Sequence, residues 1–192
     1  SFEALPKPEN KDLAVLINPS TSTTGLCFLL ATIARFGEDG FADYWKQLVA
    51  NGAKIVEGWT AAYSVDFSAG EGKGSYPIVV SYSSSPAATV SDDGTTSTTA
   101  SVPATAFRQI EYAGVLAGAK NPSGAKAFIE WLLTKDVQTA IPDSMYMYPV
   151  STEATLSQAM TTFGALSPSP LTLDAATIAD KRETWLATWT EA

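Results

Sequence analysis

The residues best suited to chemistry are five consecutive hydroxyl side chains at positions 20–24, Ser-Thr-Ser-Thr-Thr. They separate an apolar run at 13–17 from a helical pattern that begins at Leu26. Side-chain hydroxyls and backbone N–H groups at the start of a helix suit an anionic or hydroxyl-bearing small ligand, because the helix dipole is positive there. The alternative is purely structural, since serine and threonine are preferred helix caps.

Two aromatic residues stand where strands are expected to end. Trp59 follows Gly58 at a strand-to-helix turn, and Tyr82 closes an apolar run. Aromatic faces accept flat rings and cations, and ligands of open α/β sheets bind beyond the carboxyl ends of the strands. The alternatives are core packing for Trp59 and a surface hydroxyl for Tyr82. Sequence alone leaves these alternatives open.

Strands that alternate with helices must hold these residues in place. Apolar runs predict buried strands at 13–17, 53–56 and 78–82. Apolar residues at helical spacing predict helices at 26–36, 41–49, 60–69, 121–133 and 174–191. The order of these elements predicts an α/β fold whose sheet is covered by helices on both faces.

The remaining stretches have less regular patterns. Residues 1–12 are polar and resemble a linker, 91–101 form a Ser/Thr-rich surface loop, and 107–116 are a candidate extended segment. Residues 143–148 are expected to be irregular because Pro142 and Pro149 bracket them. Apart from Trp59, the tryptophans lie in helical stripes and are expected to pack in the core: Trp45, Trp131, Trp185 and Trp189.

The composition excludes several classes of function. The net charge of −8 and pI near 4.4 argue against nucleic acid, whose phosphates require a basic surface. The chain has no histidine, which removes Ser-His-Asp and Cys-His triads and histidine metal sites. The acidic residues show no metal-loop spacing, and the single cysteine, Cys27, cannot form an internal disulfide. No run approaches the length of a membrane span, and residues 1–5 do not resemble a secretory signal.

Several short runs in collinear order carry a family resemblance. They lie at residues 20–26, 36–39, 58–63, 81–87, 146–150 and 181–189. Together they resemble the thiamine-binding solute-binding proteins of ABC importers over nearly the whole chain. The resemblance implies a type II periplasmic-binding-protein fold, an α/β lobe with a mixed sheet covered by helices on both faces.

The resemblance also implies a function and a site. It implies the substrate-binding component of an ABC importer, not an enzyme, that captures thiamine, thiamine monophosphate or thiamine diphosphate in an interlobe cleft. The component delivers its ligand to a membrane permease and needs no cofactor. The implied ligand-binding residues are Ser22, Thr23, Trp59, Tyr82 and Tyr146. Two positions depart from the relatives' pattern, because Tyr146 stands where they carry Trp and Ala88 where they carry Tyr.

By the same resemblance, most of the first lobe is absent, and the chain is hypothesised to be a fragment. We expect residues 1–105 to form the second-lobe core, 106–146 to cross to the first lobe, and 147–192 to return as a helical segment. The implied protein is periplasmic or extracellular, either free or lipid-anchored. The surface that the missing lobe leaves uncovered is a candidate for self-association.

Three other functions are weighed against this one. Solute-binding proteins for ferric iron or another small cation share the architecture, but the iron-binding relatives typically supply adjacent tyrosines, and no Tyr-Tyr pair occurs here. A serine hydrolase lacks both a G-x-S-x-G elbow and a histidine. A non-catalytic cell-surface module is suggested by the Ser/Thr-rich stretch, whereas the buried strands and helical stripes disfavour it.

Overall fold

The chain divides into two compact units. The computed structural model describes residues 1–192. Unit 1 comprises Ser1–Ser83, Val102–Arg108 and Ser167–Ala192. Unit 2 comprises Ser84–Ser101 and Gln109–Leu166. The expected lobe boundaries, at 105/106 and 146/147, are a different division of the chain and stay a prediction.

Unit 1 is built on a small parallel sheet. Its strands are β1 (Ala14–Ile17), β2 (Lys54–Val56) and β3 (Ile78–Val79), in the order β2-β1-β3. The central strand β1 pairs in parallel with both neighbours, with Leu16 opposite Ile55 and Val15 opposite Val79. All four residues of β1 are buried, as expected for a strand covered on both faces.

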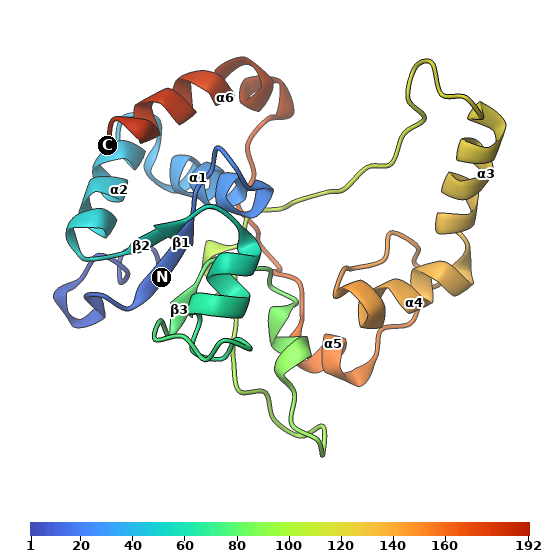
Figure 1. The fold of residues 1–192 in the computed structure, drawn as a ribbon, viewed down its shortest axis with the longest axis horizontal. Coiled ribbons are helices and arrows are strands. Elements are labelled where there is room, and N and C mark those ends of the chain that lie inside the picture. The colour runs from blue at the N-terminus through green and yellow to red at the C-terminus, as the bar shows by residue number, and fades with distance from the viewer. The chain divides into compact units, whose positions relative to one another are not determined.

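Three helices cover one face of this sheet. They are α1 (Thr23–Phe36), α2 (Phe41–Ala50) and α6 (Ala175–Thr190), and they gather on one side of β1 in Figure 1. Trp45 of α2 and Trp189 of α6 meet edge to face, with ring centroids 5.6 Å apart. The indole Nε1 of Trp45 donates a hydrogen bond of 3.0 Å to Thr32 Oγ1 of α1. The apolar stripes read from the sequence therefore form the core of unit 1.

A π-helical segment, η2 (Thr60–Asp66), covers the other face, where Ala62 packs with Val15 and Ile17. The predicted α/β class with both faces covered is confirmed. The strands all run parallel, so the expectation of a mixed sheet is wrong for this sheet. The segment predicted as a helix to residue 69 ends at Asp66, because the chain turns there and Ser68 N–H bonds to the Tyr76 carbonyl at 2.9 Å.

The polar start of the chain packs against the core of unit 1 and is not a linker. It contains the short helix η1 (Pro8–Asn10). Phe2 is 2% exposed, and its carbonyl accepts a hydrogen bond of 2.9 Å from the Tyr44 hydroxyl. Leu5 also packs against this core, and the Asn51 side chain donates hydrogen bonds to the Leu5 and Lys7 carbonyls. These contacts join residues far apart in the sequence, so no periodic pattern of apolar residues marks the segment.

The predicted extended segment at 107–116 forms no strand apart from one bridge at Phe107. After the short helix η4 (Pro103–Thr105), Phe107 forms an isolated parallel bridge with Leu171. Residues 109–116 form neither helix nor strand, and Ile110, Tyr112 and Leu116 are exposed. Apolar composition alone does not make a strand, because a strand also needs a partner for its backbone hydrogen bonds.

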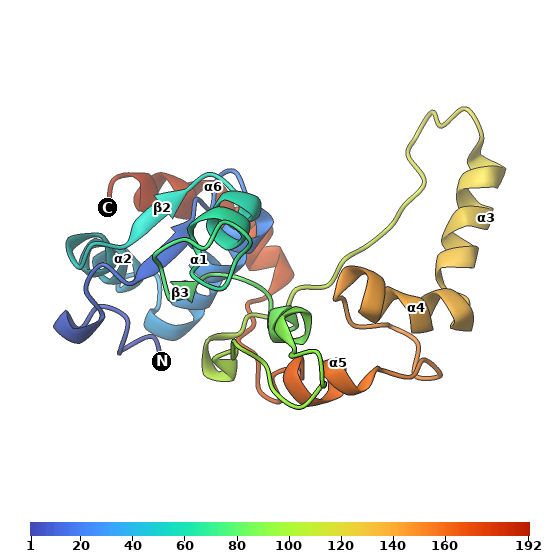
Figure 2. The ribbon, with the colours of Figure 1, turned by 60° about the horizontal axis from the view of Figure 1, so that its bottom comes forward.

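Unit 2 is mainly helical. It contains η3 (Ser85–Thr89), α3 (Pro122–Leu132), α4 (Lys135–Met145) and α5 (Gln158–Phe163), which Figure 2 shows from a second direction. Asn121 caps α3 by accepting a hydrogen bond of 3.0 Å from Gly124 N–H. The Ser/Thr-rich stretch is a loop, as predicted, with one isolated antiparallel bridge between Val90 and Ser97.

Helix α4 runs through a proline, which corrects the prediction of an irregular stretch after Pro142. Pro142 lies in the last turn, so the helix loses a single internal hydrogen bond there. Gln138, 5% exposed, donates to the Leu132 carbonyl at 2.7 Å and accepts from Val150 N–H at 2.8 Å. These bonds hold the segment after the helix against α4.

The expectation that the helical tryptophans pack in the core is wrong for Trp131. Its side chain is 53% exposed, beside Phe128 at 56% and Leu133 at 57%. Within unit 2 the helix packed against α3 is α4, which covers only part of the apolar stripe. None of the helices combines the length and hydrophobicity that crossing a bilayer requires.

Candidate binding site

The predicted site residues of unit 1 follow the carboxyl ends of the three parallel strands. The hydroxyl-rich turn follows β1, the Gly58–Trp59 turn follows β2, and Ser81 and Tyr82 follow β3. Since all three strands run parallel, these ends meet at one edge of the sheet. This edge is the usual ligand-binding edge of open α/β sheets.

Local hydrogen bonds join the first two turns. The Asn18 side-chain oxygen accepts a bond of 2.8 Å from Ser20 N–H, which shapes the turn after β1. Thr21 Oγ1 donates to the Glu57 carbonyl at 2.7 Å, and Asn18 Nδ2 lies 3.3 Å from the Glu57 carboxylate. The turn after β1 is thereby held beside the turn after β2.

Ser22 and Thr23 stand at the start of α1. Ser22 occupies the N-cap position with extended backbone, yet its side chain makes no capping hydrogen bond. The turn lines a small pocket of about 170 Å³. The residues around it are Pro19, Ser20, Thr21, Ser22, Thr23, Leu26 and Arg182. Hydroxyls, a helix N-terminus and a guanidinium together form a polar hollow suited to an anionic group.

Trp59 and Tyr82 are neighbours in space. Their ring centroids lie 6.2 Å apart with an interplanar angle of 44°. Trp59 also stacks on Tyr63, one turn later in η2, at 4.7 Å and 12°. Tyr82 is 43% exposed. The pair therefore offers aromatic surface to a flat or cationic ligand.

Two hydroxyl groups bond to the polar ends of these rings. Trp59 Nε1 donates a hydrogen bond of 2.9 Å to Ser81 Oγ. Thr24 Oγ1, in the first turn of α1, donates one of 3.0 Å to the Tyr82 hydroxyl. The second bond links the aromatic pair directly to the helix that carries the hydroxyl-rich turn.

Cys27 lies in α1, close after the hydroxyl-rich turn. Burial raises the pKa of the Cys27 thiol in α1 to about 11, which disfavours the thiolate at neutral pH. No group of three or more His, Cys, Asp or Glu side chains is arranged to hold a metal ion.

Tyr146 belongs to unit 2, so its role in the same site stays a prediction. It follows α4 in the left-handed conformation, with φ of 51°, and is 40% exposed. Ala88, the other position that departs from the relatives' pattern, also belongs to unit 2 and is exposed.

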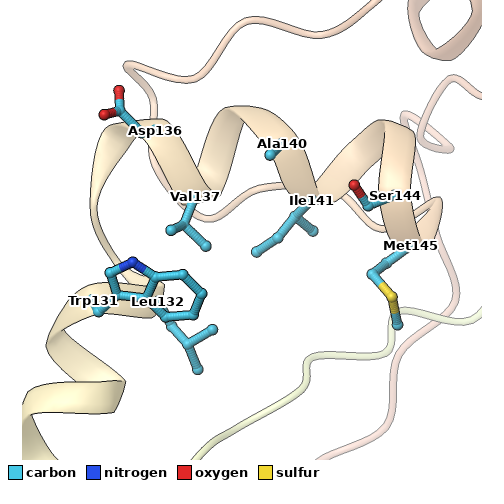
Figure 3. A pocket seen from close by; sticks show the side chains of 8 residues that line it. All are labelled: Trp131, Leu132, Asp136, Val137, Ala140, Ile141, Ser144 and Met145. Atoms are coloured by element: carbon cyan, nitrogen blue, oxygen red, sulfur yellow. The ribbon is translucent and has the colours of Figure 1, made fainter.

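Unit 2 contains a separate apolar hollow between α3 and α4. In Figure 3, Val137 and Ile141 of α4 point toward Trp131 and Leu132 of α3. Its volume is about 410 Å³, and Asp136, Ala140, Ser144 and Met145 complete the lining. Few polar groups converge on this hollow, unlike the polar pocket of unit 1.

Sequence reasoning missed four residues that the structure places at or near the site: Thr24, Tyr63, Ser81 and Arg182. Trp59 and Tyr63 stand four residues apart at the start of a predicted helix, and this spacing is a signal that could have identified Tyr63. Arg182 lies far from the turn in the sequence, and only the packing of α6 brings it there.

Comparison with known proteins gives one family and several relatives. The family of bacterial extracellular solute-binding proteins matches residues 1–163. The thiamine-binding periplasmic protein of Escherichia coli strain K12 is 28% identical over 195 residues, covering 100% of this chain and 57% of the relative. The protein of the same name from Brucella melitensis biotype 1 is 31% identical over 197 residues, covering 100% and 56%. The chain thus spans a little over half the length of these relatives.

Solved structures share the fold. A periplasmic thiamin binding protein superposes with a TM-score of 0.76 at 24% identity, covering 100% of this chain and 58% of that one. A ferric binding protein from Campylobacter jejuni gives a TM-score of 0.61 at 20% identity, covering 100% and 61%. At these identities the likeness establishes the architecture and leaves the ligand open. The family match extends over residues 1–163, which is most of this chain. The chain therefore belongs to the bacterial extracellular solute-binding proteins.

Proposed function

We propose that this chain belongs to the substrate-binding component of an ABC importer that captures thiamine or one of its phosphate esters. The observation that carries the proposal is the pairing of Trp59 and Tyr82 at the same sheet edge as the hydroxyl-rich turn. The ligand class comes from the relatives in Escherichia coli and Brucella melitensis, both named thiamine-binding periplasmic proteins.

The chemistry of thiamine fits the residues of unit 1. Its thiazolium is a cation and its aminopyrimidine is flat, so both rings suit the aromatic faces of Trp59 and Tyr82. Its hydroxyethyl arm, free or phosphorylated, requires donors. The start of α1 supplies backbone N–H groups and the hydroxyls of Ser22 and Thr23, with Arg182 lining the same pocket. Tyr146 is proposed as a further aromatic contact.

The wider mechanism extends the same proposal. Ligand would be held in a cleft between two lobes and would shift them toward a closed state by contacting both. In the periplasm or outside the cell, the closed protein would then deliver thiamine to a permease in the membrane. No cofactor and no catalytic step are needed, because the ligand is carried unchanged.

A titration tests the proposal. Thiamine, thiamine monophosphate, thiamine diphosphate and ferric ion are each added to a protein that contains this chain together with both lobes of the proposed cleft, while tryptophan fluorescence and heat of binding are followed. We expect a saturable response to thiamine or its esters, because a ligand stacked on Trp59 changes the surroundings of that indole. A saturable response to ferric ion alone, with none to the thiamine series, would contradict the proposal.

Replacing Trp59 tests the site within the proposal. The Trp59→Ala substitution is expected to weaken thiamine binding by about 0.5–2 kcal/mol, the range of a cation–π contact. Trp131→Ala is the matched control, because Trp131 is an exposed tryptophan of unit 2 outside the proposed set. Equal losses in both variants, or unchanged affinity in folded Trp59→Ala, would remove Trp59 from the site.

A further inference from the structure

The rings of the proposed site are held by hydrogen bonds as well as by packing. Trp59 is constrained in two ways: Tyr63 stacks on one face of its indole, and Ser81 accepts from its Nε1. Rotation of the indole about its side-chain bonds would break the bond to Ser81 and the parallel stack together. The face opposite Tyr63 is then presented in one fixed orientation.

Tyr82 is constrained from its hydroxyl end. Its ring is 43% exposed, so packing alone restrains it weakly. Thr24, in contrast, is 5% exposed and lies in the first turn of α1. A bond from this buried hydroxyl ties the exposed phenol of Tyr82 to the first turn of α1.

We infer that Ser81 and Thr24 are positioning residues that set the orientation of Trp59 and Tyr82 before a ligand arrives. The inference rests on the proposed function for the ligand, while the two hydrogen bonds are properties of the chain itself. Fixing both rings in advance reduces the ordering cost of binding, which is how preorganised sites gain affinity.

Both hydroxyls can be removed with little change in side-chain volume. Ser81→Ala removes a single oxygen atom, and Thr24→Val keeps the branched shape while removing the donor. Both variants break the hydrogen bond to the neighbouring ring, and the signal of that ring reports its orientation. Ser81→Thr and Thr24→Ser retain the hydroxyls and serve as rescue variants.

The chain contains a matched control for an indole–hydroxyl bond. Trp45 Nε1 donates to Thr32 Oγ1 at 3.0 Å inside the core, outside the proposed site. Thr32→Val removes a bond of the same type. It should alter the signal of Trp45 and the stability of the chain, but not the affinity for thiamine.

The experiment uses chain labelled with 5-fluorotryptophan and 3-fluorotyrosine and observed by fluorine NMR. Trp59→Phe and Tyr82→Phe assign the two resonances. Without ligand, Ser81→Ala should shift and broaden the Trp59 resonance, and Thr24→Val should do the same to Tyr82. Each rescue variant should restore the original signal. Thiamine affinity should fall by roughly three- to tenfold in Ser81→Ala and Thr24→Val, matching the loss of one hydrogen bond. It should return in the two rescue variants.

The outcomes separate the two proposals. Unchanged resonances in Ser81→Ala and Thr24→Val, or affinity losses that the rescue variants do not reverse, would overturn the positioning role. If the resonances respond as expected but the wild-type protein with both lobes shows no response to thiamine or its esters, the proposed function fails and the positioning role stands. Should Ser81→Ala not fold, Ser81→Cys replaces it, because a thiol keeps the unbranched shape of the side chain and accepts hydrogen bonds only weakly.

Discussion

Arg182 is the residue that most changes the chemistry of the hydroxyl-rich turn. It lies in α6, more than 150 positions after this turn in the sequence, yet it lines the same pocket as residues 19–23. Its side chain is 43% exposed, and its guanidinium pairs at 2.9 Å with the neighbouring Glu183. That partner is itself highly exposed, so the pair is weak in water and the guanidinium can turn to a bound anion.

Replacing this charge should separate thiamine from its phosphate esters. We expect Arg182→Gln to weaken binding of thiamine monophosphate by about 1 kcal/mol, or roughly fivefold, because it removes a charge-assisted contact at a partly exposed site. Binding of unphosphorylated thiamine should change little. Calorimetric titration of both ligands measures the difference, with Arg35→Gln as a control, since Arg35 pairs with Glu3 instead. Equal losses for both ligands would show that Arg182 does not read the phosphate.

Helix α1 is the element that brings the site together, and Gly25 allows its position. A Cβ built on Gly25 would lie 2.5 Å from the Ile17 carbonyl oxygen and 2.7 Å from that of Asn18. Both are backbone atoms at the end of β1 and cannot move aside separately. The first turn of α1 therefore approaches β1 closely only because residue 25 has no side chain.

The Gly25→Ala substitution should be destabilising despite the higher helix propensity of alanine. We expect the free energy of unfolding to fall by about 1–3 kcal/mol, the usual cost of overpacking. Urea unfolding of unit 1, followed by fluorescence, measures it. Gly58→Ala is the matched control, because its added methyl would meet nothing within 4 Å. A Gly25→Ala variant as stable as the wild type would mean that α1 can shift away from β1 without cost.

At the scale of the whole molecule, the two units differ in how well they bury apolar side chains. The buried hydrophobic residues lie almost entirely in unit 1, and only Ala87 and Met160 belong to unit 2. Unit 2 instead exposes Phe128, Trp131 and Leu133. Since apolar burial supplies most of the favourable free energy of folding, unit 2 should be the less stable part.

Unfolding should therefore proceed in two stages. With 5-fluorotryptophan in all five tryptophan positions, the Trp131 resonance should reach its unfolded position at lower urea than that of Trp45. Trp131 reports on unit 2 and Trp45 on the core of unit 1. A single shared midpoint for all resonances would instead indicate that the two units unfold together.

Much of unit 1 could be predicted because its signals are local. The apolar run of β1 and the stripes of α1 and α2 are each repeated several times within one short segment, so their periodicity is clear. Helix α4 was missed because Pro142 is normally a breaker, and its tolerance in the last turn depends on where the helix ends. Residues 109–116 form no strand, although their apolar residues favour one, because a strand needs a partner for its backbone hydrogen bonds.

The sequence by itself determined the α/β class, the central elements of unit 1 and the family resemblance, because these follow from short-range patterns and collinear runs. It also placed the hydroxyl-rich turn, Trp59 and Tyr82 at element ends. Only the tertiary structure decided that parallel pairing brings those ends to one edge, that Ser81 and Thr24 bond to the rings, and that Arg182 joins the turn. Such contacts depend on how distant segments pack, which no local pattern encodes.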